Sequence, residues 1–182
     1  MNLGISHYAG YSLVVRSPRW TEEHEAQGKG CHALFTSMRG GVSAEIFSRV
    51  GGEIYVAGLN DAELPLPKLA TDAKVEKGKT EVLGLAAQRL LGSEGGGNAG
   101  DLEVVREGLC FRPVTARGTP VIGRIADEEL GILGTKSGRE GGVFIAAGHG
   151  PWGISLGLGT GLVVSEMLEG KEESVDVSGL GV

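Results

Sequence analysis

The chain of 182 residues contains few of the residues that identify whole classes of protein. It has two cysteines, Cys31 and Cys110, without a C-x-x-C pair or a pair of histidines nearby. That spacing gives no basis for a zinc site and favours reduced, buried thiols over a disulfide. Lysine and arginine occur only in short clusters such as RSPR at 16–19, and the net charge is −6. Because a nucleic-acid groove needs clustered positive charge, we expect no nucleic-acid partner.

Long apolar runs are absent as well. No stretch approaches the ~20 apolar residues of a membrane span. The first ten residues, MNLGISHYAG, lack the basic segment and apolar core of a signal peptide. We therefore expect a soluble, intracellular protein of the cytoplasm. Its 41% hydrophobic and 22% charged residues are ordinary for a globular chain long enough to bury a core.

Glycine is the residue that the chain has in excess. Its 33 glycines follow no G-X-Y period, which excludes collagen and favours a turn-rich α/β or α+β protein. Runs at 11–17 and 31–38 predict strands. The stretch AEIFSRV-GG-EIYVAGL at 44–59 predicts a hairpin, in which two adjacent glycines supply the positive φ of a two-residue turn.

A helix is predicted near 72–91, where Gly92 gives a natural stop. Its apolar residues approximate a helical stripe: Val75, Val82, Leu83, Ala86, Leu90 and Leu91. The next stretch, SEGGGNAG at 93–100, predicts a flexible Gly-rich loop or hinge, because glycine is costly to order.

The second half of the chain predicts three strands and a helix. DLEVVREGLCFRPV reads as a long strand ended by Pro113, TARGTPVIGRI as a turn and a short strand, and GGVFIAA as a buried strand. A helix follows in ISLGLGTGLVVSEMLEG, and the acidic tail EGKEESVDVSGLGV is expected to be solvated. Gly157, Gly161 and Ser165 share one face of this helix, where another backbone or a flat ligand can approach closely.

The stretch GHGPWG at 148–153 has the formal spacing G-x-G-x-x-G, between a strand and a helix. A dinucleotide-binding fingerprint has this form, with an acidic residue about 20 positions on, here among 172–176. Three features oppose that reading. Pro151 and Trp152 are stiff and bulky where such a turn is tight, the strand comes late, and no further βαβ unit fits before Val182.

The wider sequence favours another family. EGLCFRPVTARGTPVIGRI, followed by GGVFIAAGHGPWGISLGLGTGLVVSEML, resembles the C-terminal part of FAD-dependent oxidoreductases of the D-amino-acid oxidase and glycine oxidase type, especially fungal-type members with GHGPWGIS. The pattern RPVT-x-x-G-x-P-x-I-G at 112–123 makes this resemblance specific. YAGYSLVVRSPRW and EIFSRVGGEIYVAGLND resemble the first strands of the family's substrate domain, so the resemblance covers nearly the whole chain.

The resemblance implies an α+β fold. Residues 1–110 would form an antiparallel substrate-domain sheet with a helix, and residues 111–182 the C-terminal strand–turn–helix of a FAD-binding domain. The family's N-terminal G-x-G-x-x-G turn and its ribose-binding acid have no counterpart here. We therefore expect a fragment, a truncated product or half of a split enzyme, binding FAD weakly or not at all without an N-terminal FAD-binding half.

The resemblance also implies a cofactor site. It places six residues along the N1–C2=O edge of the flavin: His149, Gly150, Trp152, Gly153, Ile154 and Ser155. The unpaired N–H groups at a helix N-terminus attract negative charge, which flavin reduction places at this edge. The glycines would let the ring come close. The alternative is a tight strand–helix turn that binds no ligand.

Arg112 is implied to hold the substrate carboxylate, since a guanidinium forms two parallel charge-assisted bonds. No catalytic residue is assigned, because the cofactor does the chemistry. The alternative is a surface arginine paired with a glutamate. Some glycine-oxidase-like members carry a second arginine after the histidine, where this chain has Pro151 and Trp152. This departure puts a simple amino acid in doubt as the substrate and makes a bulkier or secondary amine as plausible.

The other candidate side chains carry weaker signals. His7, His24 and His32 have no metal-ligand spacing, no metal site is predicted, and Ser155 and Ser165 lack triad partners. Tyr8, Tyr11 and Tyr55 lie on expected strands, where one could face a substrate and packing is the simpler role. The leading prediction is a FAD-dependent oxidoreductase acting on the CH–NH or CH–NH2 group of a small amine or amino acid. The alternatives are a non-catalytic interaction module or remnant of such an enzyme, and a NAD-binding domain.

Overall fold

The computed structural model describes residues 3–28, 32–39, 41–92, 100–132, 135 and 141–182. The chain divides into two compact units, which we call the sheet unit (Ala9–Phe111) and the turn unit (Met1–Tyr8 with Arg112–Val182). Cys31 and all but the last residue of the Gly-rich loop lie outside the described residues.

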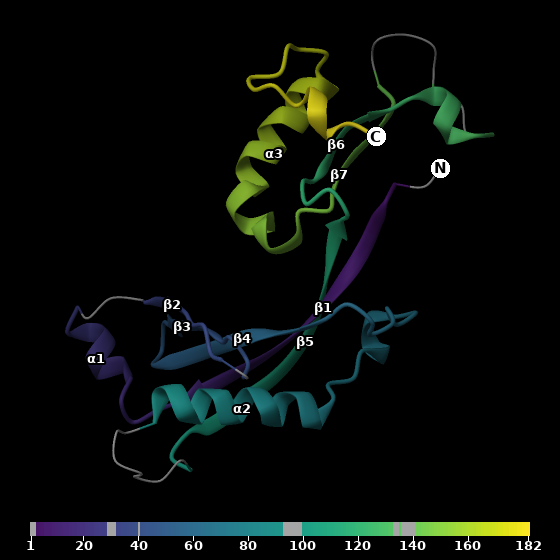
Figure 1. The fold of residues 1–182 in the computed structure, drawn as a ribbon. Coiled ribbons are helices and arrows are strands. Elements are labelled where there is room, and N and C mark those ends of the chain that lie inside the picture. Colours follow the sequence, from purple (N-terminus) through teal and green to yellow (C-terminus); the bar gives the residue numbers. More distant parts are fainter. Residues whose placement is uncertain (1–2, 29–31, 40, 93–99, 133–134, 136–140) are drawn as a thin grey trace. The chain divides into compact units, whose positions relative to one another are not determined.

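A five-stranded antiparallel sheet dominates the sheet unit, in the order β2-β3-β4-β1-β5 (Figure 1). Its strands are β1 (Ile5–Arg16), β2 (Ala33–Phe35), β3 (Glu45–Arg49), β4 (Glu53–Asp61) and β5 (Glu103–Thr115). A short helix, α1 (Glu22–Ala26), follows β1. The predicted hairpin is confirmed, since β3 pairs with β4 and both turn glycines have positive φ. The loop is one residue longer than predicted, because the last pair is Arg49 with Glu53 and Val50 joins the two glycines in the turn. With its helices, the sheet also confirms the predicted α+β class.

Helix α2 (Lys77–Leu91) covers one face of this sheet (Figure 1). A 3-10 turn, η1 (Ala70–Asp72), precedes it, and the extended backbone at Glu76 delays its start beyond the predicted residue 72. The buried face contains Thr80, Leu83, Ala86 and Ala87, which pack toward the core side of β1 and β4. Val82 was wrongly included in the stripe, because its side chain is 45% exposed.

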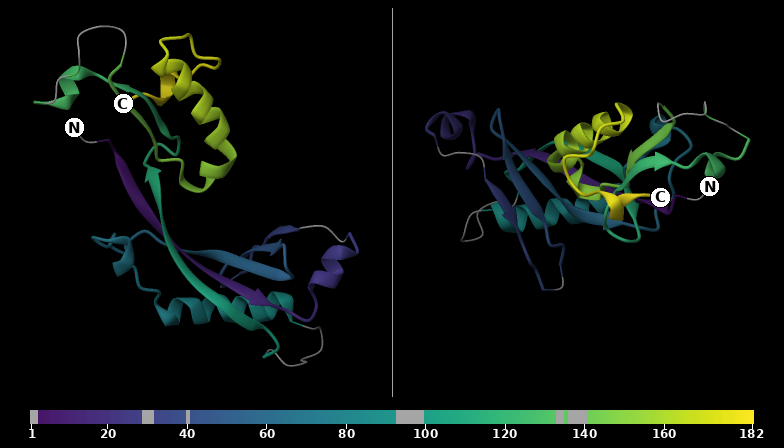
Figure 2. Two further views of the ribbon diagram at one scale, coloured as in Figure 1. Left: turned by 180° about the vertical axis from the view of Figure 1, so that it is seen from behind. Right: turned by 90° about the horizontal axis from the view of Figure 1, so that it is seen from above.

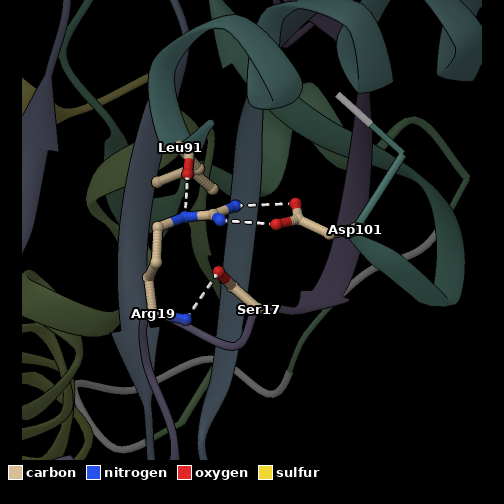
Figure 3. Close-up of polar contacts among 4 residues, drawn as sticks. All are labelled: Ser17, Arg19, Leu91 and Asp101. Carbon is tan, nitrogen blue, oxygen red and sulfur yellow. Dashed lines mark hydrogen bonds and ion pairs between the residues drawn. The ribbon is translucent and has the colours of Figure 1, made fainter. Parts of the chain in front are cut away.

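Arg19 ties the two ends of the connection between α2 and β5 together (Figure 3). Its guanidinium donates to the carbonyl oxygen of Leu91, the last residue of α2, and forms a bidentate pair with Asp101. The bond from Nη2 of Arg19 to the Asp101 carboxylate is 2.8 Å long. This clamp fixes the end of α2 beside the start of β5.

Strand β5 differs from its prediction in two ways. First, it continues past Pro113 to Thr115. Proline is tolerated there because β5 is an edge strand, where a residue without an N–H need not break a ladder hydrogen bond. Cys110 is free, as predicted, but it is exposed rather than buried. Glu107 of the same strand accepts a hydrogen bond from Thr80 of α2, so alternation places Cys110 on the face of β5 that α2 does not cover.

The turn unit contains the two-stranded sheet of β6 (Val121–Ile125) and β7 (Val143–Ala147) with helix α3 (Gly153–Leu168) beside it (Figure 2). Three 3-10 turns complete it: η2 (Asp127–Leu130), η3 (Gly150–Trp152) and η4 (Ser178–Leu180). The prediction of β7 as a buried strand is wrong, because Val143 is exposed and the other residues are at most half-buried. In the described residues only β6 pairs with β7, so one edge of that strand stays open.

The acidic tail is mostly exposed, as predicted, but it is tied to the unit. The Arg117 guanidinium donates to the carbonyl oxygens of Leu180 and Gly181, at 2.8 and 3.2 Å. The Ser174 amide donates to the Glu166 carboxylate at 2.9 Å. These bonds tie the tail to α3 and to the turn that precedes β6.

Candidate functional site

The predicted cofactor turn connects β7 to α3 within the turn unit. Gly148 and Gly150 take positive φ values of 81° and 56°, and the amide of Trp152 donates to the carbonyl oxygen of His149 at 3.1 Å. A side chain at Gly148 would lie 2.6 Å from the Thr115 methyl group, so only glycine fits there. The turn is therefore held in one tight conformation against the end of β5.

The first turn of α3 has no side-chain cap. Its N-cap residue is Trp152, which offers no acceptor, and no side-chain cap bond is formed. The first amides of a helix lack partners within the helix and carry partial positive charge. Ser155 and the 99% exposed Ile154 lie in this turn. The start of α3 can thus receive an anionic or carbonyl group from outside the chain.

Open space continues along the helix. A Cβ atom added at Gly157, Gly159 or Gly161 would meet no atom within 4 Å. Leu158, on the same exposed side as Ile154, is 91% exposed. A flat ligand or another backbone therefore has room to approach, as predicted from the spacing of small residues.

His149 links the turn to the helix. Its Nε2 atom lies 3.0 Å from the hydroxyl of Thr160, two turns into α3. The residue also forms a backbone bridge with Val114, at the end of β5. His149 thus positions the turn between α3 and β5, and neither Val114 nor Thr160 was singled out from the sequence. No periodicity marks such contacts, because they join residues of unrelated local patterns.

Arg112 lies two residues before Val114 and is half-buried. Alternation along a strand directs both side chains to the same face. The Val114 side chain reaches to 3.6 Å from the position that a Cβ of Gly150 would occupy. The structure therefore brings the strand end of Arg112 and the predicted cofactor turn together.

Ser155 lines a second feature, an apolar cavity of about 340 Å³ between α3, β6 and the tail. Leu156, Val163, Val177 and Leu180 are among the apolar residues that line it. No group of three metal-ligating side chains occurs among the described residues. In the same part of the chain, no helix has both the length and the apolar character needed to cross a membrane.

The family model of the FAD dependent oxidoreductases (DAO) matches residues 2–167. The chain belongs to this family. An oxidoreductase-like protein of Schizosaccharomyces pombe, C1F5.03c, is 31% identical over 97% of this chain and 40% of its own length. A D-amino acid dehydrogenase of Cereibacter sphaeroides is 28% identical over 100% of this chain and 34% of its own length. The chain thus spans about two fifths or less of these relatives.

Solved structures agree on the fold of this oxidoreductase chain. Glycine oxidase from Geobacillus kaustophilus has a TM-score of 0.70 at 23% identity, and iminodiacetate oxidase from Chelativorans sp. BNC1 has a TM-score of 0.62 at 16% identity. Each match covers all of this chain and 40% of the solved one. The family membership and amino-acid-oxidase-like fold inferred from the two sequence motifs are therefore confirmed, whereas the roles of the site residues stay predictions.

Proposed function

We propose that this chain supplies the substrate-side sheet and the flavin-edge turn of a FAD-dependent oxidoreductase acting on a CH–NH or CH–NH2 group. The backbone bridge between Val114 and His149 carries the proposal, because it joins the Arg112 strand to the turn before α3. Residues 1–110 would serve as the substrate domain and residues 111–182 as the C-terminal portion of the FAD-binding domain.

The start of α3 fits the edge of a flavin. Its uncapped amides offer partial positive charge, and the open space at its glycines admits a flat ring. The cofactor contacts would come from the predicted set: His149, Gly150, Trp152, Gly153, Ile154 and Ser155. FAD, when bound, would supply the electron acceptor for oxidation at the carbon–nitrogen bond.

Arg112 would orient the substrate by binding its carboxylate through two parallel charge-assisted hydrogen bonds. The carbon next to the amine is then held toward the cofactor, and fixed orientation of this kind lowers the entropic part of the barrier. The relative named D-amino acid dehydrogenase is consistent with an amine or amino-acid substrate. Pro151 and the 61% exposed Trp152 add stiff, apolar surface, which suits a bulkier or secondary amine.

A FAD titration tests the cofactor role. The chain is mixed with FAD alone and with a separately produced polypeptide that carries a strand, a G-x-G-x-x-G turn and a helix. We expect flavin fluorescence to report tight binding only in the mixture. Stoichiometric flavin in the chain purified by itself would contradict the need for a second half.

A matched pair of variants tests the placement of the flavin edge at α3. Ser155→Asp adds negative charge to the first turn, where it repels an anionic ligand yet favours the helix itself. Ser165→Asp adds the same charge near the other end. We expect about tenfold weaker FAD binding in the mixture for Ser155→Asp and a change below about twofold for Ser165→Asp. Equal binding by both variants would remove α3 from the cofactor site.

A non-catalytic interaction module is the second candidate, and the exposed apolar side of α3 favours it. Ile154 and Leu158 would then contact a partner protein without any cofactor. Failure of FAD to bind in the presence of the G-x-G-x-x-G half, while the two polypeptides still associate, would support this function instead.

A further inference from the structure

The histidine of the turn before α3 has a ring whose two nitrogens lie in different surroundings. The Nε2 atom of His149 lies 3.0 Å from the hydroxyl of Thr160. The Nδ1 atom has no hydrogen-bond partner among the described residues. A neutral imidazole has one N–H donor and one acceptor nitrogen, and the hydrogen bond at one nitrogen decides which of the two carries the proton. The bond to Thr160 therefore determines what His149 offers to a ligand.

His149 is held at its backbone as well as at its ring. A backbone bridge joins it to Val114 at the end of β5, and its carbonyl oxygen accepts a hydrogen bond from the Trp152 amide at 3.1 Å. Thr160 lies about two turns after Gly153, the first residue of α3, so the two share one face of the helix. A Cβ at Gly153 would lie 4.0 Å from the Cβ of His149, which places this face beside the histidine. The ring therefore has a fixed position.

The Thr160 hydroxyl has one proton to donate, and the structure offers it one acceptor. A hydroxyl on a helix can donate to a backbone carbonyl one turn earlier, as Ser165 does to Leu162 at 2.7 Å. Thr160 forms no such bond in the described part of the chain. It also lines the apolar cavity between α3, β6 and the tail, next to side chains that accept no hydrogen bond. Nε2 of His149 is therefore the acceptor for the Thr160 proton.

A hydroxyl that donates to Nε2 leaves the ring proton on Nδ1. In the opposite arrangement, Nε2–H would donate to the Thr160 oxygen. The hydroxyl proton and the Nδ1 lone pair would then both lack a partner among the described residues. An unpaired polar group beside apolar side chains is costly, so the arrangement with the proton on Nδ1 is the more stable one.

We infer that Thr160 is a positioning residue, whose hydroxyl holds His149 as the neutral tautomer with its proton on Nδ1. This N–H group adds a side-chain donor to the uncapped amides at the start of α3. The consequence for the cofactor rests on the proposed function: there, His149 donates this hydrogen bond to an acceptor at the flavin edge. A donor that is fixed before the cofactor binds needs no reorganisation, which makes it effective toward negative charge.

The first test measures the tautomer in the full chain without cofactor. Two-dimensional NMR of the histidine ring nitrogens distinguishes the two neutral tautomers at about pH 8.5, where an ordinary histidine is uncharged. His149→Gln identifies the His149 signals by their loss. We expect Nδ1–H to dominate in the native chain. Thr160→Val keeps the shape of the side chain and should lower the ratio of Nδ1–H to Nε2–H about tenfold, whereas Thr160→Ser should keep it. Ser165→Ala removes a hydroxyl that bonds within the helix and should change nothing.

The second test measures FAD binding in the mixture with the G-x-G-x-x-G polypeptide. Thr160→Val should weaken binding about fivefold in the native background. In a His149→Ala background the same substitution should change binding by less than about twofold, because Thr160 acts through His149. Equal weakening in both backgrounds would show that Thr160 acts through packing alone, and the inference would fail.

The two measurements separate this inference from the function on which it rests. If Thr160→Val leaves the tautomer ratio unchanged, or the native ring carries its proton on Nε2, the inference is overturned. If the ratio shifts but Thr160→Val binds FAD like the native chain, the Nδ1 donor has no role at the cofactor. If the ratio shifts as expected and the native mixture binds no FAD, the proposed function fails and the assignment of Thr160 stands.

Discussion

In the sheet unit, α2, β1 and β4 bury side chains such as Leu13, Val56 and Leu83 to 1% exposure or less. In the turn unit, α3 is richer in apolar residues, yet Val163 is its one buried residue among those described. Ile154 and Leu158 point almost entirely to solvent. The sheet unit has a core of its own, whereas the apolar face of α3 has no counterpart in the described part of this chain. The difference agrees with the proposed function, in which a separate FAD-binding half would cover this helix.

The sharpest test of this contrast compares two leucines. Leu83→Ala should lower the free energy of unfolding of the sheet unit by about 3 kcal/mol, because it leaves a cavity in a packed core. Leu158→Ala, on the open side of α3, should lower the free energy of unfolding of the turn unit by less than about 0.5 kcal/mol. Urea unfolding followed by Trp20 fluorescence in a Trp152→Phe background measures the Leu83 variant, and Trp152 fluorescence in a Trp20→Phe background measures the Leu158 variant. Similar losses for both leucines would break the contrast.

The second test concerns the backbone of the sheet unit. Gly58 on β4 has a φ of 110°, and an added Cβ would lie 2.5 Å from the Ser43 carbonyl oxygen. Gly58→Ala should therefore cost about 2 kcal/mol of unfolding free energy, since neither the strand nor its neighbour can shift freely. The same urea titration measures it. A midpoint equal to that of the native chain would show that this close approach does not contribute to stability.

The third test applies the same change to the turn unit and expects the opposite sign. Gly157 lies inside α3 with no atom near a new Cβ. Because alanine favours a helix over glycine, Gly157→Ala should stabilise α3 by about 0.5–1 kcal/mol. Unfolding followed by Trp152 fluorescence in a Trp20→Phe background reports this unit. Destabilisation would mean that the face is already covered by atoms of the chain.

The smallest expected effect concerns the clamp at Arg19. The hydrogen bonds from the Arg19 guanidinium lower the pKa of the Asp101 carboxyl. A lowered pKa in the folded state adds stability that is complete above the unfolded value of about 3.9 and is lost as the pH falls through the folded value. The pair is partly exposed, so its contribution is small.

Asp101→Asn tests this dependence. The native chain should have the higher unfolding midpoint at pH 7 and 5, and the difference between the two should shrink toward pH 3. Thermal unfolding at these three pH values measures it. If the difference in unfolding midpoint between the two proteins does not change with pH, the contribution of the clamp does not depend on the ionisation of Asp101.

Much of the local structure could be predicted. The Gly-Gly hairpin and the last helix follow from turn chemistry and periodicity, and the structure confirms both. The errors concern burial and strand ends: Val82 and Cys110 are exposed, and β5 passes through Pro113. These properties depend on which faces and edges find neighbours, and a local pattern does not contain that information.

The motifs around Arg112 and His149 were enough to identify the family of this chain. Their glycines and prolines are required by the local backbone conformation of the turns, so they can be read from the sequence without the fold. Only the tertiary structure decided which of the three tyrosines is buried. The pairing of β1 with β5 joins residues from opposite parts of the chain, and its register follows from long-range hydrogen bonding and packing. In sequence, Tyr8, Tyr11 and Tyr55 looked alike. In the folded chain, Tyr11 is in the core, Tyr55 lies in a row of rings and Tyr8 is 36% exposed.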